Sequence, residues 1–271
     1  MVQTTTTIIT RNAEEKTGLI LQTYLSAFLT LGFLCGALCS GIYRHFSFDS
    51  HYLFFTLIFV ALGSTFFIFY FGLKPNLEEN NEIEKIKIPE KNILIYGLYM
   101  FIFMGTVMAL VDWAPLWFER ELLTTSLIAS LTIVSWSGGE TIGKFLGAKL
   151  IILTNEKIIG AYIPLFGSLI YVLIIFYGNI YLILLGLFLL GFATANFFPI
   201  VIRIALRKTT DNINTAAANL STIGFLGLLI GPAIVGYTSE IFSITSNTQA
   251  ISIIWINLFL MFIYTIRNSR L

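Results

Sequence analysis

Residues 93–111 read ILIYGLYMFIFMGTVMALV, nineteen positions without a charged side chain, and the next residue is Asp112. At about 1.5 Å of rise per residue, a helix over this run can cross the roughly 30 Å of hydrocarbon in a bilayer. The run therefore predicts a membrane-spanning helix. It also raises the question of why a carboxylate follows it, within MALVDWAPLWFER (108–120).

The composition of the whole chain is that of a membrane protein. Of its 271 residues, 56% are hydrophobic and 11% are charged, whereas about a quarter of the residues in a soluble domain are charged. The net charge of +1 gives no electrostatic reason to expect nucleic acid as a partner. Cys35 and Cys39 are the only cysteines, and two thiols alone make a poor metal site, so we expect neither a metal nor a cofactor.

Long apolar runs recur along the chain and predict an all-α membrane protein with eight spans. The predicted spans cover residues 17–43, 52–73, 93–115, 124–150, 157–177, 180–205, 213–238 and 248–266. Gly178 and Asn179 predict a tight turn between the fifth and sixth spans. Pro164 and Pro199 lie inside predicted spans, where membrane helices tolerate kinks.

Basic residues predict the orientation, because cytoplasmic loops carry an excess of Lys and Arg. With eight spans, both termini lie on the same side of the membrane. Fourteen of the 16 Lys and Arg residues fall on or near that side, and only Arg44 and Arg120 fall on the other. We therefore expect a multi-pass protein of the cell (inner) membrane with both termini in the cytoplasm.

Two stretches of the sequence resemble each other. LTLGFLCGALCSG (29–41) lies in the first predicted span and STIGFLGLLIGPAIVG (221–236) in the seventh, and the two run in the same direction. Parallel repeats spaced by six helices are the internal symmetry of major facilitator transporters. On this assignment the first span corresponds to helix five and the seventh to helix eleven of a twelve-helix fold.

Several motifs then support a family resemblance that covers nearly the whole chain. MALVDWAPLWF resembles the helix-seven signature of the major facilitator superfamily, in its sugar-permease-like branch related to fucose permeases. GKFLGAKL (143–150), GFATANFFPIVI (191–202) and STIGFLGLLIGPAIVG resemble that branch's helix eight, ten and eleven elements. Three departures matter. Lys144 and Ala148 replace the usual arginine and aspartate, Glu140 replaces an apolar residue, and the first four helices are absent.

The resemblance implies a partial major facilitator fold, helices five to twelve, in three parts. Residues 1–73 would be a two-helix remnant of the N-terminal bundle, 74–92 a cytoplasmic inter-bundle loop, and 93–271 the C-terminal six-helix bundle. It implies secondary transport of a small polar solute, a sugar or related metabolite, by alternating access. The alternatives are an inactive remnant, one part of a split transporter whose missing helices come from a separate polypeptide, and a non-transporting receptor or scaffold.

Asp112 is the sharpest candidate for contact with the solute or with a coupling proton. A charged residue near the centre of a span costs at least about 2.5–3.5 kcal/mol and usually faces a bundle interior or a watery cavity. The alternative is a carboxylate hydrated at the membrane interface, because Glu119 follows only two turns later. Trp113 could stack on a sugar or belong to an interfacial aromatic belt, and the belt is favoured for Trp117.

Glu140 and Lys144 have the spacing and order of a favourable helical ion pair. Proton coupling and drift in a degenerating gene are the alternatives for Glu140. Asn196 lies in mid-span, where an amide either bonds another helix or contacts the solute. The remaining candidates predict close helix packing or gating, and they are Gly32, Gly36, Gly143, Gly147, Gly227, Gly231 and Pro232. GETIGKFLG (139–147) lacks the spacing of a phosphate loop, so we expect no enzyme.

Overall fold

The computed structural model describes residues 15–71, 89–156, 158–176, 179–210 and 212–242. This part of the chain is all-helical and contains no strand. The predicted all-α membrane fold is confirmed, and its elements follow the predicted spans closely. The eighth span, predicted over 248–266, lies outside the described residues. The elements are α2 (Glu15–His45), α3 (Ser50–Phe71), α4 (Lys91–Arg120), α5 (Ser126–Leu153), η1 (Ile158–Tyr162), α6 (Ile163–Phe176), α7 (Ile180–Thr194), α8 (Phe197–Arg207) and α9 (Ile213–Phe242).

Five helical segments of the described chain are long and apolar enough to cross a membrane. They are Ser26–His45, Lys91–Arg120, Ile158–Phe176, Ile180–Arg207 and Thr215–Thr238. The segment His51–Phe66 of α3 is apolar but shorter. Helix α5 carries Glu140 and Lys144 and is not among the five, although it is 28 residues long and packs among them.

Proline breaks the sixth predicted span into α7 and α8. The break falls at Ala195 and Asn196, immediately before the first turn that contains Pro199. A proline ring has no N–H and clashes with the carbonyl four residues earlier, which here is that of Ala195. At its other end α7 begins on Asn179, whose Oδ1 accepts hydrogen bonds from the N–H groups of Tyr181 at 3.0 Å and Leu182 at 3.3 Å.

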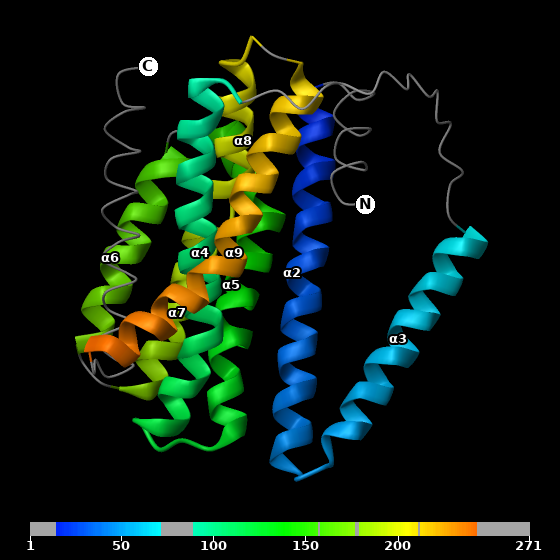
Figure 1. The fold of residues 1–271 in the computed structure, drawn as a ribbon, viewed down its shortest axis with the longest axis vertical. Coiled ribbons are helices and arrows are strands. Elements are labelled where there is room, and N and C mark those ends of the chain that lie inside the picture. Colours follow the sequence, from blue (N-terminus) through cyan, green and yellow to red (C-terminus); the bar gives the residue numbers. More distant parts are fainter. Residues whose placement is uncertain (1–14, 72–88, 157, 177–178, 211, 243–271) are drawn as a thin grey trace.

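The helices from α4 to α9 form one bundle, with α2 packed on its side and α3 leaning away from it (Figure 1). Helix α4 packs on α9, α5 on both α2 and α7, and α7 on α6. The end with Arg44, Arg120 and Ser126 is at the bottom of Figure 1 and is called the lower end; the end with Lys91 and Arg207 is the upper end. The side chains described on α3 are mostly exposed, and Tyr43 Oη lies 2.8 Å from Thr56 Oγ1 where α3 turns back from α2.

Two buried apolar clusters hold the bundle together. Trp117 and Phe118 of α4 lie in the lower cluster with Tyr171 of α6 and Leu187 of α7. Tyr96 and Met100 lie in the upper cluster with residues of α8 and α9. Trp117 is only 3% exposed, so the aromatic-belt interpretation of this residue is wrong.

Glycines bring the backbones of α4 and α9 into direct contact. A Cβ added to Gly227 would collide with the Phe101 carbonyl, and one added to Gly231 would collide with Gly105. The other glycine pair, Gly32 and Gly36 on α2, has no atom within 4 Å of such a Cβ in the described part of the chain. The two GxxxG pairs of the sequence repeat therefore have different surroundings.

This difference predicts opposite effects for the same substitution. Gly231→Ala should lower the free energy of unfolding by about 1–3 kcal/mol, because the methyl group is forced against the α4 backbone. Gly36→Ala should leave it unchanged or raise it by up to about 1 kcal/mol, because alanine is the better helix former. Denaturant titration of the purified protein in detergent measures both, and equal losses in the two variants would contradict the packing described.

Candidate functional site

Helix α2 packs along the length of α5, a contact called here the α2–α5 seam. Near the lower end, a Cβ on Gly41 would collide with the Ser130 side chain. Towards the upper end, the Phe145 ring lies 5.6 Å from the ring of Tyr24 and 5.9 Å from that of Phe28, measured between centroids. The seam therefore extends over about four turns of α5.

A charged cluster lies in the middle of this seam. Glu140 Oε1 is 2.8 Å from Lys144 Nζ, and the two side chains are 16% and 13% exposed. The ion pair expected from the spacing is therefore present. The Lys144 ammonium also reaches across to α2, where it donates to Thr30 Oγ1 at 2.9 Å and to the Ser26 carbonyl at 3.4 Å. Glu140 and Thr30 lie close to the midpoints of their helices, so the cluster is far from either end of the bundle.

In this cluster the donors of Lys144 are all in use, whereas acceptors on its neighbours are not. An ammonium has three N–H donors, and those of Lys144 are directed at Glu140, Thr30 and Ser26. Within the described part of the chain Glu140 has no polar contact besides Lys144, so its second carboxylate oxygen keeps its acceptor capacity. Thr141 Oγ1, one residue along, is buried without a hydrogen-bond partner there. The cluster can thus accept hydrogen bonds from a further group, and Lys144 has no donor to spare.

Asp112 is exposed on α4. It lies about 12 Å from the lower end of α4 at Arg120, because eight residues of 1.5 Å separate them. Asp112 and Glu119 are seven residues, two turns, apart and share one face of the helix, and Glu119 contacts Arg44 of α2. Asp112 therefore faces the side of α4 on which α2 lies. It has no hydrogen bond or ion pair within the described residues.

Trp113 points to a different neighbour than Asp112 does. Its indole Nε1 donates to the carbonyl of Pro232 on α9 at 3.3 Å, and its ring lies against Gly236. Ala109 and Val235 complete this small apolar cluster. Trp113 and Pro232 therefore belong to the contact between α4 and α9.

Asn196 joins the break between α7 and α8 to α5. Its side chain is 3% exposed, and its Nδ2 donates to the Gly143 carbonyl at 2.9 Å. A Cβ on Gly147 would collide with the Asn196 amide, so this glycine is what allows the side chain to lie so close to α5. Asn196 Oδ1 is buried without a partner among the described residues.

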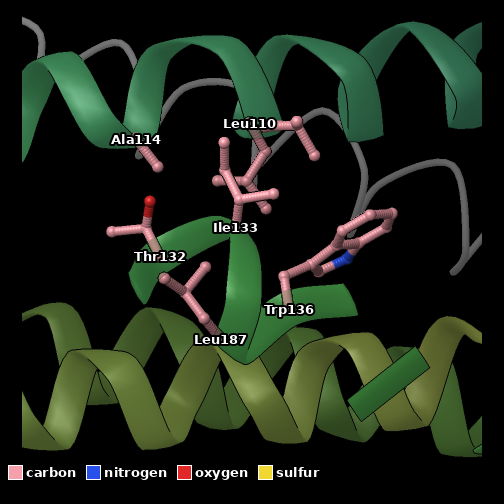
Figure 2. A pocket seen from close by; sticks show the side chains of 7 residues that line it. Leu110, Ala114, Thr132, Ile133, Trp136 and Leu187 are labelled. Atoms are coloured by element: carbon pink, nitrogen blue, oxygen red, sulfur yellow. The ribbon is translucent and has the colours of Figure 1, made fainter. Parts of the chain in front are cut away.

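A small apolar gap lies between α4, α5 and α7, and it is too tight to admit a water molecule. Figure 2 shows Leu110, Ala114, Ile133, Trp136 and Leu187 around it. Its one hydroxyl, Thr132 Oγ1, already donates to the Ala129 carbonyl at 2.7 Å. Pockets for small molecules usually measure roughly 300–1,000 Å³ and include polar groups that orient the ligand, so this one is a packing gap rather than a solute site.

Sequence reasoning missed the partners on α2. Neither Thr30 nor Ser26 was singled out, since a hydroxyl and a carbonyl in an apolar helix carry no signal of a lysine opposite. The pair of Arg44 with Glu119 was also missed, although Arg44 was one of two basic residues predicted on its side. At the upper end, Glu156 lies 3.0 Å from Arg203 and 2.9 Å from Arg207.

Comparison with known proteins adds partial likenesses to an MFS-type transporter and to a second membrane protein. No protein-family model matches the chain. A segment of 62 residues is 36% identical to an uncharacterised MFS-type transporter from Yersinia pestis, and it covers 23% of this chain and 16% of that protein. A longer segment of 162 residues is 25% identical to membrane protein MosC from Rhizobium meliloti, covering 55% of this chain and 36% of MosC.

The chain is a transporter-like membrane protein. It spans about a third or less of the length of these two curated relatives, so the activity of a whole transporter is a matter for proposal. Its helical fold and multi-pass character agree with the likeness.

The buried ion pair generates a prediction about stability. Glu140→Ala should lower the free energy of unfolding by about 3 kcal/mol, because it leaves the Lys144 charge buried without its counter-ion. The double variant Glu140→Leu/Lys144→Leu should be closer to the wild type than Glu140→Ala is, because it removes both charges together. Denaturant titration in detergent measures the difference. A double variant that is less stable than the single one would argue against a buried pair.

Proposed function

We propose that the chain contributes helices five to twelve of a major facilitator transporter, which moves a small polar solute across the membrane by alternating access. In this assignment α2 and α9 are the equivalent helices of the two halves. Residues 1–73 belong to the N-terminal bundle, 74–92 to a cytoplasmic loop and 93–271 to the C-terminal bundle. The lower end then faces outward and the upper end the cytoplasm of the bacterial cell.

The observation that carries the proposal is the contact from Lys144 to α2. Solute and coupling-ion sites of secondary transporters lie near the midplane of the bilayer, where two repeats meet. Lys144 donates to Thr30 close to the midpoints of α5 and α2, and α2 is the helix assigned to the other half. Charged residues inside a membrane mark ion or solute pathways more often than they serve packing alone.

The hydrogen bonds that these side chains can still form favour one class of solute. Glu140, Thr141 and Asp112 can accept further hydrogen bonds, whereas the donors of Lys144 are already used. A neutral solute rich in hydroxyl groups, such as a sugar or polyol, supplies donors to these acceptors. An anionic solute would have to displace Glu140 from Lys144. Protons are the proposed coupling ion, carried on Glu140 or Asp112.

The fucose-permease-related branch is supported by the motifs around Asp112 and Gly231, and it also favours a sugar. Trp113 and Asn196 contribute indirectly in this proposal. Trp113 holds α4 against α9, and Asn196 holds the α7–α8 break against α5. Gly143 and Gly147 allow that approach, while Gly227 and Gly231 keep α9 against α4. In this proposal Gly32 and Gly36 pack against other helices of the N-terminal half.

Uptake into proteoliposomes tests the proposal. The complete transporter should accumulate a radiolabelled hexose or polyol faster when an inward proton gradient is imposed, and the matching sugar acid should compete poorly. Asp112→Asn should reduce uptake by roughly tenfold or more, because a hydrogen bond to a charged group is worth about 1.5–3 kcal/mol.

Asp49→Asn is the matched control, because Asp49 is an exposed carboxylate between α2 and α3, and its uptake should equal that of the wild type. Undiminished uptake in Asp112→Asn would remove this residue from the mechanism. If the wild type and the variants all bind the solute saturably and none transports it, the result would favour a receptor.

A further inference from the structure

The connection between α2 and α3 is a well-defined helix cap. Ser47 adopts a left-handed conformation with a φ of 55°. Its N–H donates to the Arg44 carbonyl at 3.2 Å, and the N–H of Phe48 donates to the Tyr43 carbonyl at 3.0 Å. These two hydrogen bonds are those of a Schellman motif, which frequently adds an apolar contact between its outer residues. The rings of Tyr43 and Phe48 make that contact, with 5.6 Å between their centroids. The backbone therefore fixes how this turn presents its side chains.

Aromatic rings gather around Phe48 at the tip of the turn. Its ring centroid lies 6.0 Å from that of Phe46 and 6.4 Å from that of Tyr52. The exposed fractions are 55% for Phe48, 64% for Phe46 and 62% for Tyr52. These three residues, called here the aromatic turn, form an apolar patch on the described part of the chain. An exposed apolar patch marks contact with another molecule or with a membrane.

The apolar helices on either side place the aromatic turn at the edge of the hydrocarbon. The apolar segment of α2 ends at His45, and that of α3 begins at His51. The α2 segment, Ser26–His45, has 20 residues and is about 30 Å long, which matches the hydrocarbon core of a bilayer. Phe46 and Phe48 therefore follow where the acyl chains give way to headgroups.

We infer that the aromatic turn is a lipid anchor, which inserts its rings among the upper acyl chains and headgroups of the leaflet at the lower end. Helix α3 leans away from the bundle and its described side chains are mostly exposed (Figure 1), so lipid can reach the turn. Aromatic side chains are favoured at this depth. Arg44 and Asp49, which flank the rings in sequence and are exposed, remain in the headgroup layer. The anchor fixes the depth of the α2–α3 hairpin, and it does not depend on the proposed transport.

Tryptophan fluorescence of the full chain in lipid nanodiscs tests the anchor. Phe48→Trp keeps an aromatic ring at the centre of the patch, and the emission that it adds to that of the wild type is measured. The nanodiscs would consist of phosphatidylcholine, part of which carries a nitroxide quencher near the top of an acyl chain, and iodide would serve as the quencher in water. The added emission should be blue-shifted, largely lost to the lipid quencher and little affected by iodide. Phe46→Trp should behave in the same way.

Leu123→Trp is the matched control. Leu123 lies at the same end of the molecule, in the connection between α4 and α5, and it also has a positive φ, of 50°. It is 84% exposed, but its neighbours include the exposed Glu121 and Thr125 instead of aromatic rings. Iodide should quench its added emission. The anchor is overturned if lipid quenching is no stronger in Phe48→Trp than in Leu123→Trp. It is also overturned if neither quencher reaches Phe48→Trp, because protein would then cover the turn.

A reporter at Tyr52 tests whether the two phenylalanines hold the turn in the lipid. In a Tyr52→Trp protein, the added changes Phe46→Ser and Phe48→Ser should shift the reporter emission to longer wavelengths and increase its quenching by iodide. The reason is that a single ring buries less apolar surface in the bilayer than three rings do. Unchanged quenching would overturn the anchor. None of these measurements involves uptake, so a failed anchor leaves the transport proposal standing, and failed uptake leaves the anchor standing.

Discussion

The hydrogen bond from Lys144 to Thr30 is the contact on which the arrangement of α2 depends. An ammonium at mid-helix in a membrane needs partners, and Glu140 on the same helix supplies only one. The others come from α2, where Thr30 donates its own proton to the Ser26 carbonyl at 2.8 Å and so turns a lone pair towards Lys144. This contact sets the height of α2 along α5, since a shift of one turn would separate the two groups. The height of α2 in turn brings Arg44 opposite Glu119.

The bundle combines two kinds of helix contact. Glycine backbones on α4 and α9 meet directly, and the buried clusters behind them unite α4 with α5, α6, α7 and α8. Glu90 adds to this unit at the upper end by accepting a hydrogen bond from the backbone N–H of Thr210 at 3.2 Å. Along α2, the hydrogen bond from Lys144 to Thr30 and the ring contacts of Tyr24 and Phe28 with Phe145 join the helix to α5, and Gly41 approaches Ser130 closely near the lower end.

Much of the fold could be predicted from the sequence because hydrophobic runs fix where helices lie. The predicted spans agree with α2 to α9, and the kink at Pro199 follows from its missing N–H. The candidate site was only partly predictable. The Glu140–Lys144 pair could be inferred because the partners share a helix, but the third partner, Thr30, lies 114 positions away. The repeat of 29–41 and 221–236 suggested equal roles for its glycines. Gly231 contacts α4, whereas no atom of the described residues lies within 4 Å of a Cβ added to Gly36. Periodicity indicates the faces of a helix and does not indicate which neighbour covers each face.

A double-mutant cycle between Thr30 and Lys144 tests the central contact most directly. Thr30→Val, Lys144→Met and their combination would be compared by denaturant titration in detergent, beside Thr222→Val. Thr222 occupies the equivalent place in the repeat, and its hydroxyl donates only within α9, to Ala218 at 2.8 Å. A coupling of about 1 kcal/mol is expected for Thr30 with Lys144, and additivity within about 0.5 kcal/mol for Thr222 with Lys144. Additive effects for Thr30 and Lys144 would contradict it.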